Sequence, residues 1–477
     1  MNNRLMSALA ASALMLGGCT IGPDYVKPSI TVPESFGHSE PAASARVDSE
    51  WWKRFDDPRL NSSIDEALRA NHDLQSARFT VESMLGQFDQ AKSYLYPQIN
   101  ANGSYTRKGV DNAASGGYTL HEGITSTYAA SLALTSYEID LFGKVRRANE
   151  AARAMLLSSE YAKETLRLSI AANVAASYMK IASLQEQIVL AQTNVETSRE
   201  IMELTELKYR HGVIAETAYL QSQSEYENAR ATLSQLQASK ISEEANFNLL
   251  LGRNPSRVST TSLEAISVPE VPEALPSEIL TSRPDIAAAE QNLIAANAQI
   301  GIARAQYFPS IKLTGMMGIQ SLELNDFLSN PAKIWEIAPS LSVPLFSAGR
   351  IAGEIKTAEA DQNKTLAQYQ KTIVSAFNDT DNALGQAQKA KEQMAYQSKR
   401  SAMIEKAYEQ ARLQYRVGTI AYNDMLIVQQ QWLQAKQNYL ISRQNGLTAA
   451  VNLYKALGGG WKDESASIIP DLLPAGR

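Results

Sequence analysis

The feature that most constrains this 477-residue chain is an internal duplication of a helical turn. Residues 207–230 and 413–436 align in register, and both copies begin with the same leucine, tyrosine, arginine and glycine pattern. Each copy predicts the end of a long helix, a break at Gly212 or Gly418, and the start of a returning helix. A chain that repeats a helical hairpin is expected to repeat the fold around it.

The sequence on either side of the turns also repeats. A helical pattern over 57–94 stops just before Pro97, and the pattern that ends at Pro309 aligns with it. Each proline is followed by a period-two pattern, then by a long stretch without helix breakers that leads to the glycine turn. We therefore predict a tandem duplication of helix, β-hairpin, long helix, turn and helix.

This plan divides the chain into six segments. They are a signal peptide over 1–18, a lipidated N-terminal tether over 19–56, a first repeat over 57–251, a proline-rich connector over 252–276, a second repeat over 277–457 and a C-terminal tail over 458–477. The β-hairpins are expected at about 97–140 and 309–346, and the helical turns at 212 and 418.

The predicted strands have two unlike faces. Between about 127 and 134, Tyr128, Leu132 and Leu134 alternate with small or hydroxylated residues, as in a strand with lipid on one side and water on the other. After Cys19 no apolar run is long enough for a helical span, so a membrane crossing would need a closed barrel. Four strands cannot close one, and we expect the barrel to be shared between copies of the chain.

The long helix after the first hairpin has coiled-coil periodicity. From Ile170 to Met202 its apolar and small residues step alternately by four and three positions, which is a 3.5-residue repeat. We expect such helices to pack side by side as a tube under the barrel.

The N-terminus has the pattern of a secretory signal. Arg4 precedes a short apolar run that ends in Leu16, Gly17, Gly18 and Cys19, and Cys19 is the sole cysteine. The pattern resembles a bacterial lipobox, which implies a covalent lipid on Cys19 and, because Thr20 follows, sorting to the outer membrane. The alternative is an ordinary signal peptide beside a buried cysteine.

Composition argues against several function classes. A net charge of −5 without a basic patch argues against nucleic-acid binding. The four histidines have no cysteine or carboxylate at ligand spacing, so neither a metal site nor catalysis is predicted, and no cofactor is expected beyond the lipid. These histidines are His38, His72, His121 and His211.

Several motifs, in order along the chain, carry a family resemblance. They include CTIGPDYVKP from Cys19, DLFGK at 140–144, PLFSAGR at 344–350 and VNLYKALGGGW at 451–461. The chain resembles the outer-membrane efflux channels of the TolC and OprM type, in the lipoprotein branch that includes CusC and NodT. The resemblance implies a mainly α-helical homotrimer with a shared transmembrane β-barrel of twelve strands and a periplasmic helical tube. It also implies an exit duct for drugs or toxic solutes that works with a periplasmic adaptor and an inner-membrane transporter of the RND type.

The same resemblance assigns residues at the two glycine turns. It implies a gate on the second turn at Asp424, with Tyr415 and Arg416 holding the closed form. The equivalent zone of the first turn contains Tyr209, Arg210 and Glu216, and the predicted adaptor-contacting tip consists of Gly212, Val213, Gly418 and Thr419. Three symmetry-related carboxylates in a narrow pore would repel one another and attract cations. The alternative for Asp424 is a solvated acid in the first turn of a helix, and that for both glycines is a purely structural cap.

Three other functions stay open at this stage. Met316 and Met317 suggest a copper or silver duct, although adjacent strand residues point to opposite faces. The same fold also serves polypeptide secretion in some channels. A periplasmic coiled-coil scaffold without a channel is a third alternative, which the amphipathic strand pairs oppose.

Overall fold

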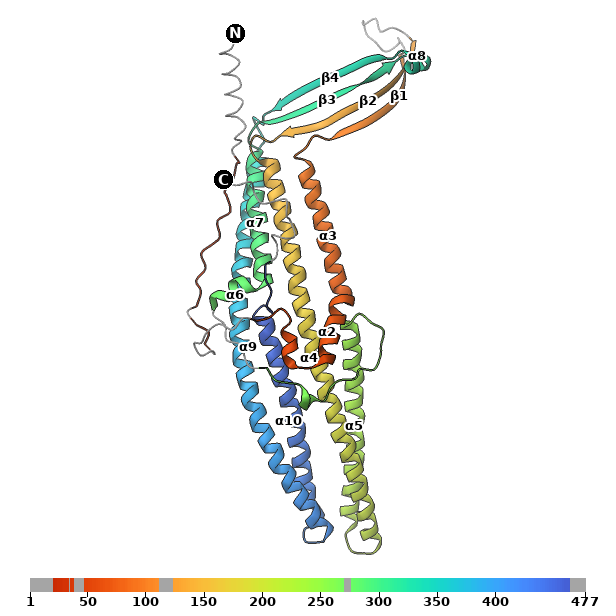
Figure 1. Cartoon of the computed structure of the whole chain (residues 1–477), viewed down its shortest axis with the longest axis vertical. Coiled ribbons are helices and arrows are strands. Elements are labelled where there is room, and N and C mark those ends of the chain that lie inside the picture. Colours follow the sequence, from red (N-terminus) through yellow and green to blue (C-terminus); the bar gives the residue numbers. More distant parts are fainter. Residues whose placement is uncertain (1–19, 34, 38–46, 111–122, 270–275, 464–477) are drawn as a thin grey trace. The chain divides into compact units, whose positions relative to one another are not determined.

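The computed structural model describes residues 20–33, 35–37, 47–110, 123–269 and 276–463, and its elements form two runs of the same kind (Figure 1). The first run is the 3-10 helix η1 (Trp51–Phe55), helices α2 (Pro58–Ala70) and α3 (His72–Ser93), strands β1 (Ile99–Val110) and β2 (Gly123–Ile139), and helices α4 (Lys144–Arg210) and α5 (Glu216–Leu250). The second run is η3 (Leu263–Ala265), α6 (Pro276–Ser282), α7 (Pro284–Ala305), β3 (Ser310–Ser321), α8 (Leu324–Ser329), β4 (Ala332–Ser342), α9 (Arg350–Arg416) and α10 (Tyr422–Ala456). The signal peptide, Cys19, His38 and His121 lie outside the described residues.

The chain divides into two compact units. The sheet unit consists of residues up to Ser29, Thr80–Ser159 and Ala289–Tyr369. The hairpin unit consists of Ile30–Phe79, Glu160–Ala288 and Gln370–Arg477. Among the described helices, none is both long and apolar enough to cross a bilayer.

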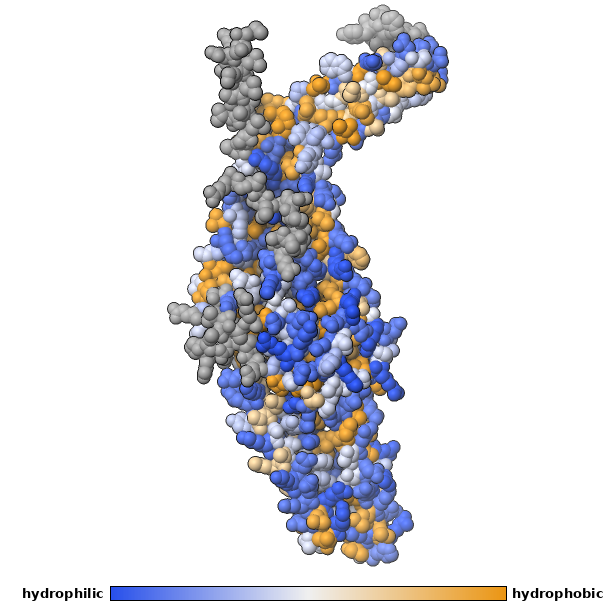
Figure 2. All heavy atoms as spheres, viewed as in Figure 1, coloured by the Kyte–Doolittle hydropathy of each residue, from blue (hydrophilic) through white to orange (hydrophobic). Residues whose placement is uncertain are grey.

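The sheet unit contains one antiparallel four-stranded sheet in the order β1-β2-β3-β4. Its register gives the two faces that alternation predicts. Leu132 pairs with Ala101 and Met317, and Met317 pairs with Trp335, so one face is apolar across all four strands. Figure 2 shows apolar side chains gathered along these strands. The opposite face contains mostly polar or small side chains: Asn100, Asn102 and Ser104 from β1, Ala129, Ser131 and Ala133 from β2, Met316, Gly318 and Gln320 from β3, and Ile334 and Glu336 from β4.

Two details of the strands were not expected from the sequence. The pairing of β2 with β3 shifts between Leu134 and Tyr137, so β2 contains a bulge with one extra residue. Strand β4 ends at Ser342, short of the end at about 346 that was expected for the second β-hairpin. Pro344, which has no N–H for a ladder bond, follows two residues later.

The N-terminal segment packs along the sheet unit in an extended conformation. Ile21 donates its backbone N–H to Phe142 O (3.0 Å), and Asn297 Nδ2 donates to Pro23 O (2.9 Å). The buried Arg147 forms an ion pair with Asp24 at 2.6 Å. A Cβ on Gly301 would lie 2.8 Å from Ile21 O, so only glycine permits this close approach.

The core of the hairpin unit joins the N-terminal helices to the ends of both hairpins. Trp51 is fully buried and stacks on Tyr454 of α10, with ring centroids 5.5 Å apart. Tyr178 of α4 donates its hydroxyl to Asp57, whose carboxylate also caps the first turn of α2. These contacts link η1, α2, α4 and α10 in one core.

The returning helices α5 and α10 end in the same way. Gly252 and Gly458 both have positive φ and lie directly against the backbone of the segment that leads into α3 or α7. A side chain then binds the last carbonyls: Asn71 Nδ2 donates to Leu250 O (2.8 Å), and Arg283 donates to Ala456 O (3.2 Å). Both repeats therefore keep the glycine contact at the end of the returning helix. The side chain that binds the last carbonyls differs: it is Asn71 in the first repeat and Arg283 in the second.

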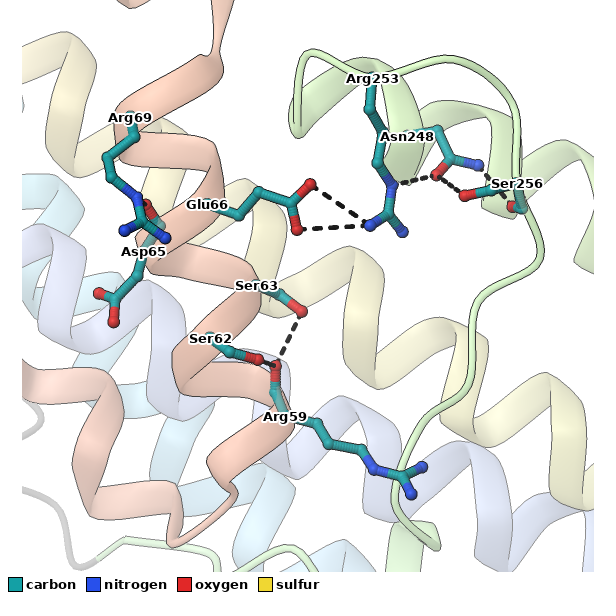
Figure 3. Close-up of polar contacts among 9 residues, drawn as sticks. All are labelled: Arg59, Ser62, Ser63, Asp65, Glu66, Arg69, Asn248, Arg253 and Ser256. Atoms are coloured by element: carbon teal, nitrogen blue, oxygen red, sulfur yellow. Dashed lines mark hydrogen bonds and ion pairs between the residues drawn. The ribbon is translucent and has the colours of Figure 1, made fainter.

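In the first repeat an ion pair adds to this joint. Arg253, just after α5, lies 3.3 Å from Glu66 of α2 and also donates to Asn248 (2.7 Å), as Figure 3 shows. Ser256 Oγ donates to the same Asn248 oxygen (3.0 Å). The first hairpin is thus fixed at its base by α2.

Candidate gate at the helical tips

The two glycine turns have the same backbone geometry. Gly212 has φ +69°, its N–H binds Tyr209 O, and the N–H of Val213 binds Lys208 O. The second turn repeats these bonds at Gly418, with φ +81°, and at Thr419. This is the left-handed helix end that glycine favours. All four bonds are 2.9–3.1 Å long.

The tips of both turns are exposed. No atom lies within 4 Å of a Cβ built on Gly212 or Gly418, and Val213 is 68 % exposed. Thr419, which replaces Val213 in the second turn, also donates its hydroxyl to Gln414 O (3.0 Å). Each turn is therefore held by hydrogen bonds within the turn itself, and its outer surface is accessible to solvent or to a partner.

The tyrosines on the two hairpins have different surroundings. Tyr415 and Tyr422 are buried together with Met425, and their ring centroids lie 5.9 Å apart. Burial raises the pKa of both hydroxyls, and for Tyr422 the negative charge of Glu225 adds to the effect. On the first hairpin, Tyr209 stacks on Tyr219 at 5.8 Å but stays 37 % exposed.

Three contacts attach the second hairpin to α4. Lys208 places its ammonium 4.5 Å from the ring centroid of Tyr415. Further from the tip, Arg412 lies 3.4 Å from Glu200. Deeper still, the buried Gln429 donates to Asn194 Oδ1 (3.0 Å). Ile201 and Leu204 of α4 pack on the Tyr415 cluster between these polar contacts.

The predicted gate residues do not bond to one another within a single chain. Asp424, Arg416 and Glu216 are exposed, and none of their side chains forms a hydrogen bond or ion pair with any described residue. Arg210 pairs with Glu206 one helical turn earlier. The structure brings Tyr415 to Lys208, which the sequence did not indicate, rather than to Asp424.

A groove with amide side chains lies between the hairpins. Its volume is about 370 Å³, and its lining includes Asn194 of α4, Asn228 of α5 and Gln430 of α10. Glu225 also lines it; burial raises the pKa of its carboxyl, while the amides of Gln430 and Asn228 oppose this shift. No cluster of three or more His, Cys, Asp or Glu side chains suited to a metal occurs in the part of the chain that the structure describes.

Comparison with known proteins gives one consistent answer. The family model described as outer membrane efflux protein matches residues 63–253 and 275–459. The chain is 34 % identical to the probable efflux pump outer membrane protein TtgC of Pseudomonas putida, over 98 % of this chain and 97 % of TtgC. This chain belongs to the outer membrane efflux protein family.

Other members of the outer membrane efflux protein family agree in sequence and fold. The cation efflux system protein CusC of Escherichia coli O6:H1 is 30 % identical over 94 % of this chain and 97 % of its own length. The crystal structure of the Campylobacter jejuni CmeC outer membrane channel matches with a TM-score of 0.88 at 25 % identity, covering 95 % of this chain and 98 % of CmeC. The family resemblance and the mainly helical fold with a four-stranded sheet, both predicted from the sequence, are confirmed.

Proposed function

We propose that this chain is the outer-membrane exit duct of a tripartite efflux pump and conducts drugs or toxic solutes passively from the periplasm to the outside. The observation that carries the proposal is the sheet. It has one apolar and one largely polar face, and both β1 and β4 pair on one side only among the described strands.

An open sheet of this kind is unstable in lipid. Unpaired backbone groups cost several kcal/mol each in hydrocarbon, so β1 and β4 must pair with strands of other copies. Three chains supply twelve strands, which leave a lumen, whereas two supply eight, which fill their own interior. A homotrimer with a shared barrel pairs the edge strands and leaves a lumen. Helices α4, α5, α9 and α10 of the three chains would form the tube.

The anchor and the partners follow from the same proposal. Cys19 carries a covalent lipid that tethers the chain to the outer membrane, and incorporation of labelled palmitate should disappear in Cys19→Ser. The exposed tips at Gly212, Val213, Gly418 and Thr419 face the periplasmic adaptor, which connects the duct to an inner-membrane transporter of the RND type. Relatives named as efflux pump outer membrane proteins support membership in an efflux pump.

We place the gate on the second hairpin. In the structure Tyr415 is buried under Lys208, and Asp424 is exposed on the first turn of α10. In a trimer, three copies of Asp424 would form an acidic ring. The three carboxylates would repel one another and attract cations. Arg416 of each copy is exposed and free to pair with such a ring. The first-hairpin residues Tyr209, Arg210 and Glu216 belong to the part that moves less.

The test is assembly and conductance of the purified chain. We expect a trimer that dissociates on heating in detergent, and discrete ion-conducting steps when this trimer is added to a planar lipid bilayer. A monomer that stays in solution without detergent and conducts nothing would contradict the proposal and favour a periplasmic scaffold.

A copper or silver duct gains no support from the site. Met316 and Met317 lie on opposite faces of β3, because Met316 pairs with Glu336 and Met317 with Trp335. Only Met316 can face the lumen, and one thioether per chain is a weak basis for selecting a soft metal ion.

A further inference from the structure

The connection between β3 and β4 contains a short helix that the proposed function does not explain. Helix α8 (Leu324–Ser329) lies in the sheet unit, in contact with β2 and β3 (Figure 1). Because β3 starts directly after α7 and β4 ends directly before α9, α8 is at the strand ends remote from these helices. In an outer-membrane duct this is the external rim.

Helix α8 is amphipathic despite its length. At 100° per residue, Leu324, Phe327 and Leu328 fall within an arc of about 100°, while Asp326 and Ser329 fall on the opposite side. Leu324 is 53 % exposed and Leu328 is 77 % exposed. An isolated exposed leucine is ordinary, but two on the same arc of one short helix form an apolar surface without a partner in the described chain.

This apolar arc adjoins the apolar face of the sheet. The ring of Phe327 lies 6.3 Å from that of Tyr128, which in turn lies 4.8 Å from Tyr105. Tyr128 and Tyr105 are cross-strand partners and share their face with Leu132 and Met317. The aromatic contacts therefore join α8 to the side of the sheet that contacts lipid in the proposed duct.

We propose that α8 is an interfacial foot, formed by Leu324, Phe327 and Leu328, that inserts into the outer leaflet of the membrane beside the barrel. The inference rests on the proposed function, since it takes the apolar sheet face as the lipid-facing one. A helix with an apolar and a polar side lies in the plane of the interface, with the apolar side buried at the headgroup boundary. Tyr128 and Tyr105 are aromatic residues of the type that membrane interfaces favour.

The foot gives the external rim a second attachment to lipid. Lipid contact explains why Leu324 and Leu328 stay exposed on a helix whose Phe327 packs on the sheet. It also explains why Asp326 and Ser329 are exposed on the opposite side, where they meet water. A second copy of the chain packed on α8 is the competing explanation.

The test uses a fluorescent label on single added cysteines in the full chain, reconstituted in phosphatidylcholine vesicles that contain a lipid with a nitroxide near its headgroup. The parent chain without an added cysteine measures background labelling of Cys19. We expect quenching at Leu328→Cys to exceed that at Ser329→Cys at least about two-fold, and aqueous iodide to show the reverse order.

A third position separates the two proposals. Ile337 lies in the middle of β4 on its apolar face, so Ile337→Cys should be quenched by a lipid with the nitroxide on its acyl chain if the sheet spans the membrane. Quenching at Ile337 with equal quenching at Leu328 and Ser329 overturns the foot and leaves the duct intact. No quenching at Ile337 overturns the duct. A Leu328 label shielded from both quenchers overturns the foot in favour of a contact between copies.

Discussion

At the α4–α5 turn, Tyr209 and Tyr219 stack on the surface, whereas at the α9–α10 turn Tyr415 and Tyr422 are buried against α4. The backbones of the two turns make the same bonds, so the difference lies wholly in side chains. The first hairpin is fixed at its base by Arg253 and Glu66. The second is fixed at its base too, by Arg283 against Ala456 O and Asp379, so the contrast between the hairpins is confined to their tips.

The largest expected effect comes from Tyr415→Ala. Removing a buried aromatic ring weakens its packing by about 3 kcal/mol, which is roughly a hundredfold in an open-to-closed ratio. We expect a marked rise in mean conductance of single channels in planar bilayers. Tyr209→Ala is the matched control on the first hairpin and should change conductance little, because its ring is partly exposed. An equal rise in mean conductance in Tyr415→Ala and Tyr209→Ala would contradict the placement of the gate on the second hairpin.

The acidic residues give the next test. Asp424→Ala should raise single-channel conductance or weaken block by divalent cations, since it removes three negative charges from one ring of a trimer. Glu216→Ala makes the same charge change on the first hairpin and should leave divalent block intact. If Asp424→Ala behaves like the parent channel in bilayers, Asp424 is not part of the gate.

The contacts between α4 and the second hairpin should have smaller effects. Lys208→Gln removes the cation from the Tyr415 ring, an interaction of about 0.5–1 kcal/mol at exposed sites. Glu200→Gln breaks an exposed ion pair with Arg412, which is typically about 0.2–1 kcal/mol. We expect each variant to raise open probability several-fold at most. A double-mutant cycle for Glu200 and Arg412 with zero coupling energy would remove that pair from the attachment.

The smallest effect concerns pH and Glu225, where the two hairpins meet. Burial raises the pKa of this carboxyl above its ordinary 4.5. The folded form therefore binds the proton more tightly, and the associated stability is present below pH 4.5 and lost as pH rises through the folded pKa. Glu225→Gln should abolish this component of the pH dependence of thermal unfolding. Persistence of the same pH profile in Glu225→Gln would assign it to another group.

The parts of the fold that the sequence predicted are those with local patterns. The glycine turns, the faces of the strands and the coiled-coil helix follow from spacing within a few residues. The bulge between Leu134 and Tyr137 breaks the period of two and has no such signal. Helix α8 is too short for its periodicity to stand out before its position beside Tyr128 is known.

The candidate site was predictable only in part. Tyr415 and Asp424 were reached by resemblance to a family, not by their local sequence. Lys208, Glu200 and Asn194 contact residues more than 200 positions away, so no pattern along the chain reveals them. Gln429 aligned with Gln223 between the repeats, but nothing in that match indicated that only Gln429 would bond to α4.

The bonds within the glycine turns have a mechanical consequence. Each turn is closed by hydrogen bonds to residues three to five positions earlier in its own chain, and none of these bonds reaches a neighbouring helix. The end of each hairpin can therefore move as a rigid body without breaking a backbone hydrogen bond of the turn. At the tip, its movement would be resisted by side-chain contacts with the neighbouring helices. Single substitutions can strengthen or weaken these contacts one at a time.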